Sequence, residues 1–274
     1  MKNVNWDLRI GAGLLLLLLA VSFVLPIFAP FDPVRWNVVP RNMPPGRGYL
    51  LGTTSLGQDV FWLLTVSIRN SLVIGFTVAL FASVIGLVMG LVAGFKGGAV
   101  DRILTLLMDA FIVVPALPIL ILFSSLTQGR ASLLGISAIL VVFNWPRPAR
   151  QVRASVLSLR ERAFIHTASF SGARFFEIIW QEIFPHVFSW SLANFVYTIL
   201  TAISTETGLA VIGLSGLENT TLGGMIYWAI QHQAILAERW WWIGAPTAVI
   251  VVLFVALVLS SSGITKYYAR KRGR

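Results

Sequence analysis

Long apolar runs are the feature that most limits how this chain can fold. Runs of about 20 apolar residues, the length that crosses a hydrocarbon layer roughly 30 Å thick, recur along the 274-residue sequence. Hydrophobic residues make up 57% of the chain and charged residues only 12%, whereas soluble domains carry about 25% charged residues. The sequence therefore predicts an all-α membrane protein that crosses the bilayer several times.

Six transmembrane helices can be placed on these runs. They cover roughly residues 10–29, 70–94, 103–126, 132–146, 187–212 and 243–263. The first run has a long apolar core and no small-residue cleavage site before Pro26, so we expect a retained anchor rather than a signal peptide.

The basic residues predict the orientation, because Lys and Arg are retained on the cytoplasmic side. Placing both termini in the cytoplasm puts 15 of the 21 basic residues there and leaves Arg35, Arg41, Arg47, Arg69, Arg130 and Arg239 outside. The formal charge of +10 then fits a chain that meets anionic lipid head groups. Nucleic-acid binding is not expected, since the basic residues lie in separate loops and form no single stripe.

A basic segment at residues 158–186 separates the fourth and fifth predicted spans. It contains small residues where a bent helix pair needs close approach, and Pro185 marks the return to apolar sequence. This pattern resembles the EAA loop of ABC importer permeases, the short cytoplasmic coupling helix that docks into a cleft of the ATPase subunit. The resemblance implies coupling roles for Arg160, Glu161, Phe164, Ala168, Gly172, Ala173, Phe175 and Pro185.

This segment departs from the family pattern at one position. His166, followed by Thr167, stands where the family has the glutamate of its EAA motif, and a histidine cannot replace a carboxylate at pH 7. The docking expectation therefore depends on Gly172, Pro185 and the amphipathic pattern around them.

A second resemblance lies before the second span. The matching residues are Leu51, Gly52, Thr53, Leu56, Gly57, Asp59 and Val60. They resemble the LGTDxLGRDV signature of the C-type permease subunit of dipeptide and oligopeptide importers. Later landmarks of the same family are matched by AGFKGGAVDR at 93–102, by Asp109 with Pro115, and by Glu206, Gly213, Gly223 and Trp241 with Trp242.

The resemblance covers about residues 8–265 and implies the type I ABC importer permease fold. Residues 1–68 would hold the anchor span, an external loop and a surface helix before the second span. Residues 69–265 would form the transmembrane permease domain, and residues 266–274 a basic cytoplasmic tail.

Four residues are candidates for the pathway or its gate. Asp109 is expected either to cap or pair with Arg102, or to line the pathway, because carboxylates in lipid face a cavity or a partner. Glu206 is expected to support the external loop, with a place at the gate as the alternative. Trp190 and Trp228 are the first candidates for stacking on a sugar, although most of the ten tryptophans fit aromatic belts at the membrane interfaces.

No enzyme activity is expected of this chain. It lacks a G-x-x-x-x-G-K-[ST] phosphate loop and a spaced histidine metal motif, so neither a cofactor nor a metal is predicted. ATP with Mg²⁺ would be used by partner subunits. The resemblance implies a heterodimer with a second permease, two ATPase subunits and an extracytoplasmic binding protein, all at a prokaryotic cytoplasmic membrane.

Two other classes of membrane protein and several cargoes stay open at this stage. A secondary carrier would need inverted repeats or a chain of intramembrane ionisable residues, neither of which is visible. A purely structural subunit would have no use for the basic segment 158–186. Peptides are the expected cargo from the resemblance, with oligosaccharides such as cello-oligosaccharides or nickel chelates as alternatives.

Overall fold

The computed structural model describes residues 5–127, 130–215 and 219–272, and the regular elements within these ranges are all helices. They are α1 (Trp6–Phe23), η1 (Leu25–Phe28), α2 (Val60–Lys96), α3 (Gly98–Val113), α4 (Ala116–Leu126), α5 (Leu133–Asn144), α6 (Pro146–Arg160), α7 (Ala163–Phe170), α8 (Phe175–Glu177), η2 (Ile178–Ile183), α9 (Phe184–Val211), α10 (Leu222–Gln231) and α11 (Trp240–Arg272). One isolated bridge joins Thr53 to Asp59. The all-α fold class agrees with the sequence prediction.

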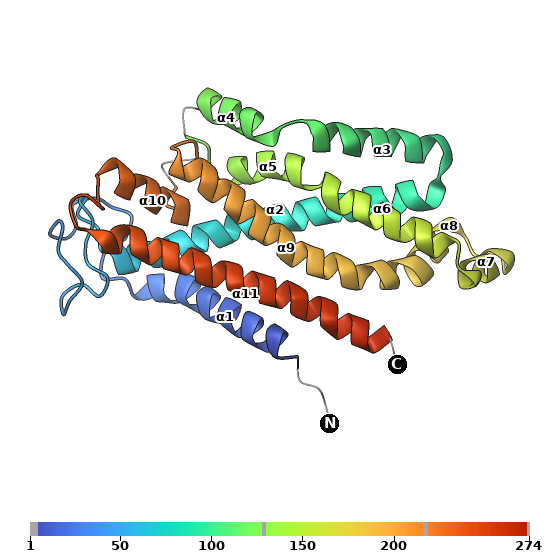
Figure 1. The fold of residues 1–274 in the computed structure, drawn as a ribbon, viewed down its shortest axis with the longest axis horizontal. Coiled ribbons are helices and arrows are strands. Elements are labelled where there is room, and N and C mark those ends of the chain that lie inside the picture. The colour runs from blue at the N-terminus through green and yellow to red at the C-terminus, as the bar shows by residue number, and fades with distance from the viewer. Residues whose placement is uncertain (1–4, 128–129, 216–218, 273–274) are drawn as a thin grey trace.

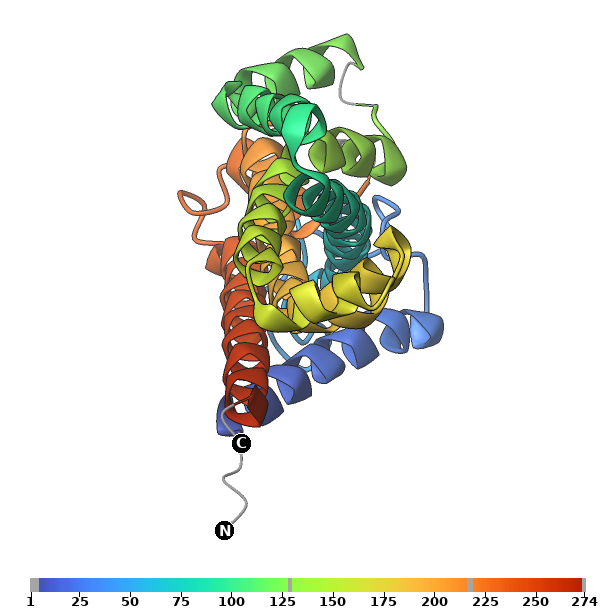
Figure 2. The same cartoon turned by 90° about the vertical axis from the view of Figure 1, so that its right-hand side faces the viewer.

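The long helices run side by side along the long axis of the molecule (Figure 1). The segment between η1 and α2 gathers with α10 at one end, which we call the loop end. Helices α7 and α8 lie at the opposite end, the α7 end. Figure 2 shows α3 and α4 on one side of the bundle and α1 with α11 on the other, so that α2, α5, α6 and α9 lie between them.

Three helices of the described chain are long and apolar enough to cross a membrane: Trp6–Phe28, Val60–Lys96 and Trp240–Tyr268. Counting each of two bent helix pairs as one span raises this number to five. The remaining predicted span, 132–146, coincides with α5, which has only 12 residues. Six spans therefore stay a prediction.

The predicted third span, 103–126, is not a continuous helix. Helices α3 and α4 meet at a bend of 73°, with Val114 and Pro115 in extended conformations between them. Proline has no backbone N–H to donate and disfavours helical geometry in the residue before it, so Pro115 breaks the helix here.

Helix α2 begins ten residues before the predicted second span, so the expected surface helix is its first turns rather than a separate element. Asp59 caps this helix by accepting the backbone N–H of Phe61 at 2.9 Å. Burial raises the pKa of the Asp59 carboxyl, while hydrogen bonds from the N–H groups of Phe61 and Trp62 act in the opposite direction.

A stripe of small residues on α2 lies against α6. A Cβ atom added at Gly90 would lie 2.6 Å from the Ala149 carbonyl oxygen, and one added at Gly94 would lie 2.7 Å from the Val156 Cβ. Ala82, on the same face, is fully buried. The close helix packing that the Ala82, Gly86, Gly90 and Gly94 spacing predicts is thus confirmed.

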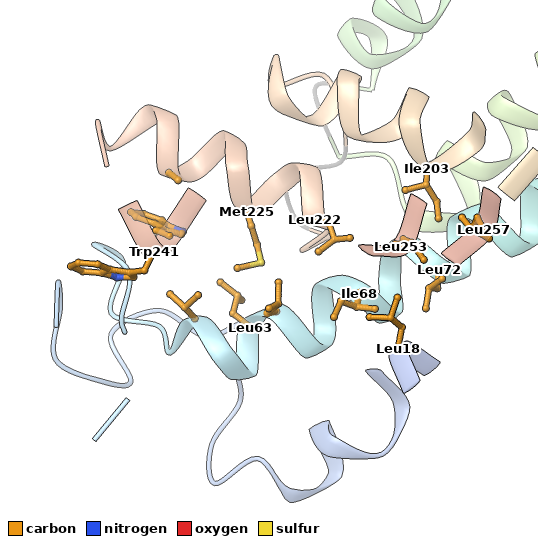
Figure 3. Packing of buried hydrophobic residues seen from close by; sticks show 14 of the residues in the cluster. Leu18, Leu63, Ile68, Leu72, Ile203, Leu222, Met225, Trp241, Leu253 and Leu257 are labelled. Atoms are coloured by element: carbon orange, nitrogen blue, oxygen red, sulfur yellow. The ribbon is translucent and has the colours of Figure 1, made fainter. Parts of the chain in front are cut away.

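The main hydrophobic cluster lies where α2, α9, α10 and α11 meet, and α1 adds Leu18 to it (Figure 3). Helices α1 and α11 approach closely, because a Cβ added at Gly263 would lie 2.6 Å from the Leu8 backbone nitrogen. Near this crossing, Lys266 pairs with Asp7. The first and last helices of the described chain, α1 and α11, therefore lie side by side (Figure 1).

Candidate functional site

The backbone explains why the signature at 51–60 carries its glycines. Gly52 and Gly57 both have φ of +73°, which favours glycine. A Cβ atom at Gly52 would meet the Met43 carbonyl oxygen at 2.7 Å. The Trp241 indole donates to the Thr53 carbonyl at 3.2 Å. The signature therefore builds a tight turn that is tied to the start of α11.

Glu206 supports the loop end from inside the bundle. Its side chain is fully buried, and its Oε1 accepts hydrogen bonds from the hydroxyls of Ser215 at 3.0 Å and Thr221 at 2.8 Å. The Thr221 hydroxyl in turn accepts the backbone N–H of Gly224, which caps α10. This geometry fits the supporting role expected of Glu206.

Helix α2 holds the same loop from the other side. The Asn70 side chain donates to the Thr220 carbonyl at 2.7 Å, and the Ser71 hydroxyl accepts the Leu222 backbone N–H at 3.1 Å. The start of α10 is thus fixed to both α9 and α2, so its position is set by several independent contacts.

The segment 158–186 folds at the α7 end as a bent pair of short helices (Figure 1). Helix α7 ends before Gly172, whose φ is +83°. The Glu177 carboxylate accepts the Arg174 backbone N–H at 2.7 Å and so caps α8. A π-helix, η2, then leads into α9, and Pro185 lies in the first turn of α9. The predicted glycine bend and proline re-entry are both present.

Isoleucines attach this segment to the bundle. Ile165, Ile178, Ile179 and Ile183 are buried and pack in one cluster with residues of α2 and α6, namely Leu91, Val152 and Val156. Ala173 and Trp190 lie at the edge of the same cluster. Displacement of α7 would therefore be transmitted to α2, α6 and α9, because packed interiors resist deformation.

The expected apolar docking face is only partly described. Phe164 is 36% exposed and stacks on His186 with ring centroids 5.4 Å apart. The side chains of Ala168 and Phe175, like that of His166, lie outside the described part of the structure. Arg160 pairs loosely with Glu161 at 3.6 Å.

Exposed aromatic residues around α7 were not predicted from the sequence. Phe170 is 91% exposed, Phe176 80% and Trp180 66%. On a face that lies in water, exposed large apolar side chains mark interaction surfaces, because soluble proteins rarely gather them. The basic residues around them are the sequence feature that could have predicted this exposure. Helical periodicity alone would have placed these aromatic residues in a core.

Two ion pairs join α3 to α6. Asp101 accepts a two-pronged contact from Arg153, with Nη2 to Oδ2 at 2.8 Å. Asp109 pairs with Arg150, so the expectation of Arg102 as its partner is wrong. Asp109 does not need Arg102 of its own helix as a partner, because Arg150 of the adjoining helix α6 reaches it.

The two tryptophan candidates are not brought together. Trp190 packs at the edge of the isoleucine cluster, whereas Trp228 packs with the main cluster and lines a cavity at the loop end. Of the two, only Trp228 therefore lines a described cavity.

Comparison with known proteins assigns the chain to a family. The family described as "binding-protein-dependent transport system inner membrane component" matches residues 86–274. The oligopeptide transport system permease protein OppC of Mycobacterium tuberculosis is 30% identical over 254 residues, which cover 91% of this chain and 85% of that protein. The corresponding OppC of Lactococcus lactis is 28% identical, with 89% and 85% covered. The dipeptide transport system permease protein DppC of Bacillus subtilis is 29% identical, with 93% and 78% covered.

A solved structure shares the fold. A chain of the inward-facing MetNI methionine ABC transporter superposes with a TM-score of 0.60 at 20% identity, covering 75% of this chain and 96% of that one. The likeness in fold and the likeness in sequence agree. This chain therefore belongs to the family of binding-protein-dependent transport system inner membrane components, the permeases of ABC importers.

Proposed function

We propose that this chain is the C-type permease subunit of an ATP-driven peptide importer and forms half of the translocation pathway. The observation that carries this proposal is the similarity, over about nine tenths of the chain, to permeases named for oligopeptide and dipeptide transport systems. A homologous second permease would form the other half. An extracytoplasmic binding protein would deliver the peptide, and two ATPase subunits would supply the energy with ATP and Mg²⁺.

The segment 158–186 is the proposed site of coupling. Closure of the ATPase subunits would displace α7, and the buried isoleucine cluster would pass this motion to α2, α6 and α9 as a rigid body. The paired permeases would then switch between inward-open and outward-open states. This chain would transmit the motion of the ATPase subunits to the translocation pathway and would make or break no covalent bonds.

Cargo is tested by uptake into proteoliposomes that contain the complete transporter. We expect ATP-dependent uptake of labelled di- to pentapeptides when the binding protein is present. A peptide carries charged termini that are costly to desolvate, whereas a neutral sugar needs hydroxyl partners and aromatic faces. Uptake of cello-oligosaccharides or a nickel chelate without peptide uptake would refute peptide cargo and leave the importer assignment intact.

Substitution of Gly172 tests whether the segment 158–186 couples ATP hydrolysis to transport. The positive φ of Gly172 disfavours a β-branched residue by roughly 1–2 kcal/mol, yet no atom lies within 4 Å of an added Cβ. Gly172→Val should therefore insert normally but transport less per ATP hydrolysed. Gly172→Asn is the matched control, because asparagine tolerates positive φ. Equal coupling in the valine variant and the wild type, measured as uptake against ATP hydrolysis, would argue against this role.

Thiol labelling tests the proposed orientation, in which both termini and α7 are cytoplasmic. A membrane-impermeant thiol reagent added to intact cells should label Arg47→Cys but not Arg160→Cys, because the chain has no native cysteine to react. Permeabilised cells, in which both variants should react, provide the control. Labelling of Arg160→Cys alone in intact cells would reverse the orientation.

A further inference from the structure

A cavity of about 370 Å³ opens at the loop end. It is lined by Val34, Trp36, Gln58, Leu63, Thr220, Met225 and Trp228, which come from the external segment, the first turns of α2, and the loop and helix of α10. Leu63 and Met225 extend toward each other between α2 and α10 (Figure 3). The cavity falls in the range of about 300–1,000 Å³ that ligand pockets occupy, and no charged side chain lines it.

Two tryptophans form the aromatic part of the lining. The rings of Trp36 and Trp228 meet edge to face, with centroids 5.7 Å apart and an angle of 78°. Trp228 also contacts Tyr227 and His232, so it is held on the fixed helix α10. Trp36 is 52% exposed. The cavity therefore has a firm aromatic wall and an accessible rim.

Gln58 supplies the polar group of the cavity. It is 4% exposed, and its amide nitrogen donates to the Val34 carbonyl at 2.7 Å. This contact fixes which way the amide points. Within the described residues, no donor is paired with its Oε1. An occupant that brings an N–H or O–H would satisfy this oxygen, whereas a purely apolar one would leave it unpaired at a cost.

The external segment that lines part of the cavity is positively charged. Arg35 lies between two lining residues of the cavity, and Arg41 and Arg47 follow in the same exposed segment. Among the described side chains, none of these three guanidinium groups pairs with a carboxylate. The segment offers only Asp32 as an exposed carboxylate, because Asp59 is buried as the cap of α2.

We propose that this cavity receives one tyrosine or tryptophan side chain from an acidic surface of the extracytoplasmic binding protein. The inference rests on the proposed function and names the contact through which the partner docks. An aromatic anchor in a central pocket, surrounded by charged groups, is the arrangement that concentrates binding energy in protein interfaces. A lipid acyl chain fits the same aromatic wall less well, because it has no donor for Gln58.

The test uses the complete transporter in lipid nanodiscs and its cognate binding protein loaded with a pentapeptide. Trp36→Ala removes one wall, and Thr220→Phe fills the cavity from its rim. Each change is expected to raise the Kd by about 10- to 50-fold. Trp240→Ala is the matched control, since Trp240 is 67% exposed at the same end but lies outside the cavity. Arg35→Glu should slow association mainly at low salt.

The possible results separate the alternatives. Unchanged affinity in Trp36→Ala or in Thr220→Phe, with normal binding by the wild type, would overturn the proposed recess. Loss of a co-purifying phospholipid from both variants without loss of affinity would assign the cavity to a lipid instead. A wild-type complex that neither binds nor is stimulated by any extracytoplasmic binding protein would overturn the proposed function itself.

Discussion

Replacing Gly90 with leucine is expected to abolish transport and to lower the yield of folded complex sharply. A Cβ atom at this position would lie 2.6 Å from both the Ala149 carbonyl oxygen and the Val152 Cβ. The oxygen belongs to the backbone of α6, so it cannot move unless the whole helix moves. Overpacking of this kind costs about 1–3 kcal/mol even where the surroundings relax.

We expect Gly90→Leu to affect more than stability, because α6 leads directly into the segment 158–186, the proposed site of coupling. Size-exclusion chromatography of the complex and ATP-dependent uptake are the measurements. Gly13→Leu on α1 provides the control, since no atom lies within 4 Å of an added Cβ there. Wild-type uptake by the Gly90→Leu complex would show that the close contact between α2 and α6 is dispensable.

Replacing Phe170 with aspartate is expected to reduce uptake at least about tenfold while leaving the permease folded. Phe170 is 91% exposed, so the substitution removes no internal packing. If this ring enters an apolar site on an ATPase subunit, the aspartate would bring an unpaired charge into that contact, and losses of this size are typical of interface hot spots.

The control for Phe170→Asp is Phe170→Leu, which keeps an apolar side chain at the same exposed position. Both variants should yield normal amounts of membrane protein. Equal uptake by the two variants would contradict the proposed contact between Phe170 and an ATPase subunit.

Local chemistry made much of this fold predictable. The apolar runs at α1, α2 and α11 are long enough to be read from hydropathy alone, and the Ala82–Gly94 stripe reveals a close helix contact through its four-residue spacing. Gly172 and Pro185 mark the bend of the segment 158–186, because glycine permits a positive φ and proline fixes φ and has no N–H to donate.

Features that depend on tertiary contacts could not be predicted from the sequence. Asp109 has a nearby arginine in its own helix, Arg102, but the partner comes from α6 instead. Trp36 and Trp228 are far apart in the chain and meet because α10 lies beside the segment between η1 and α2 (Figure 1). Pro115 was visible, yet a proline in an apolar run can either kink or break a helix, and neighbouring packing decides between these outcomes.

A cross-link from the segment 158–186 in the assembled, transporting complex tests directly whether α7 contacts an ATPase subunit. A photo-reactive residue replaces Phe170 in one variant and Leu50, which is 69% exposed at the loop end, in the other. The proposed coupling role of the segment 158–186 predicts an adduct between position 170 and an ATPase subunit, and no ATPase adduct from position 50. A complex that still imports peptide but forms no ATPase adduct from position 170, or forms one from position 50, would contradict it.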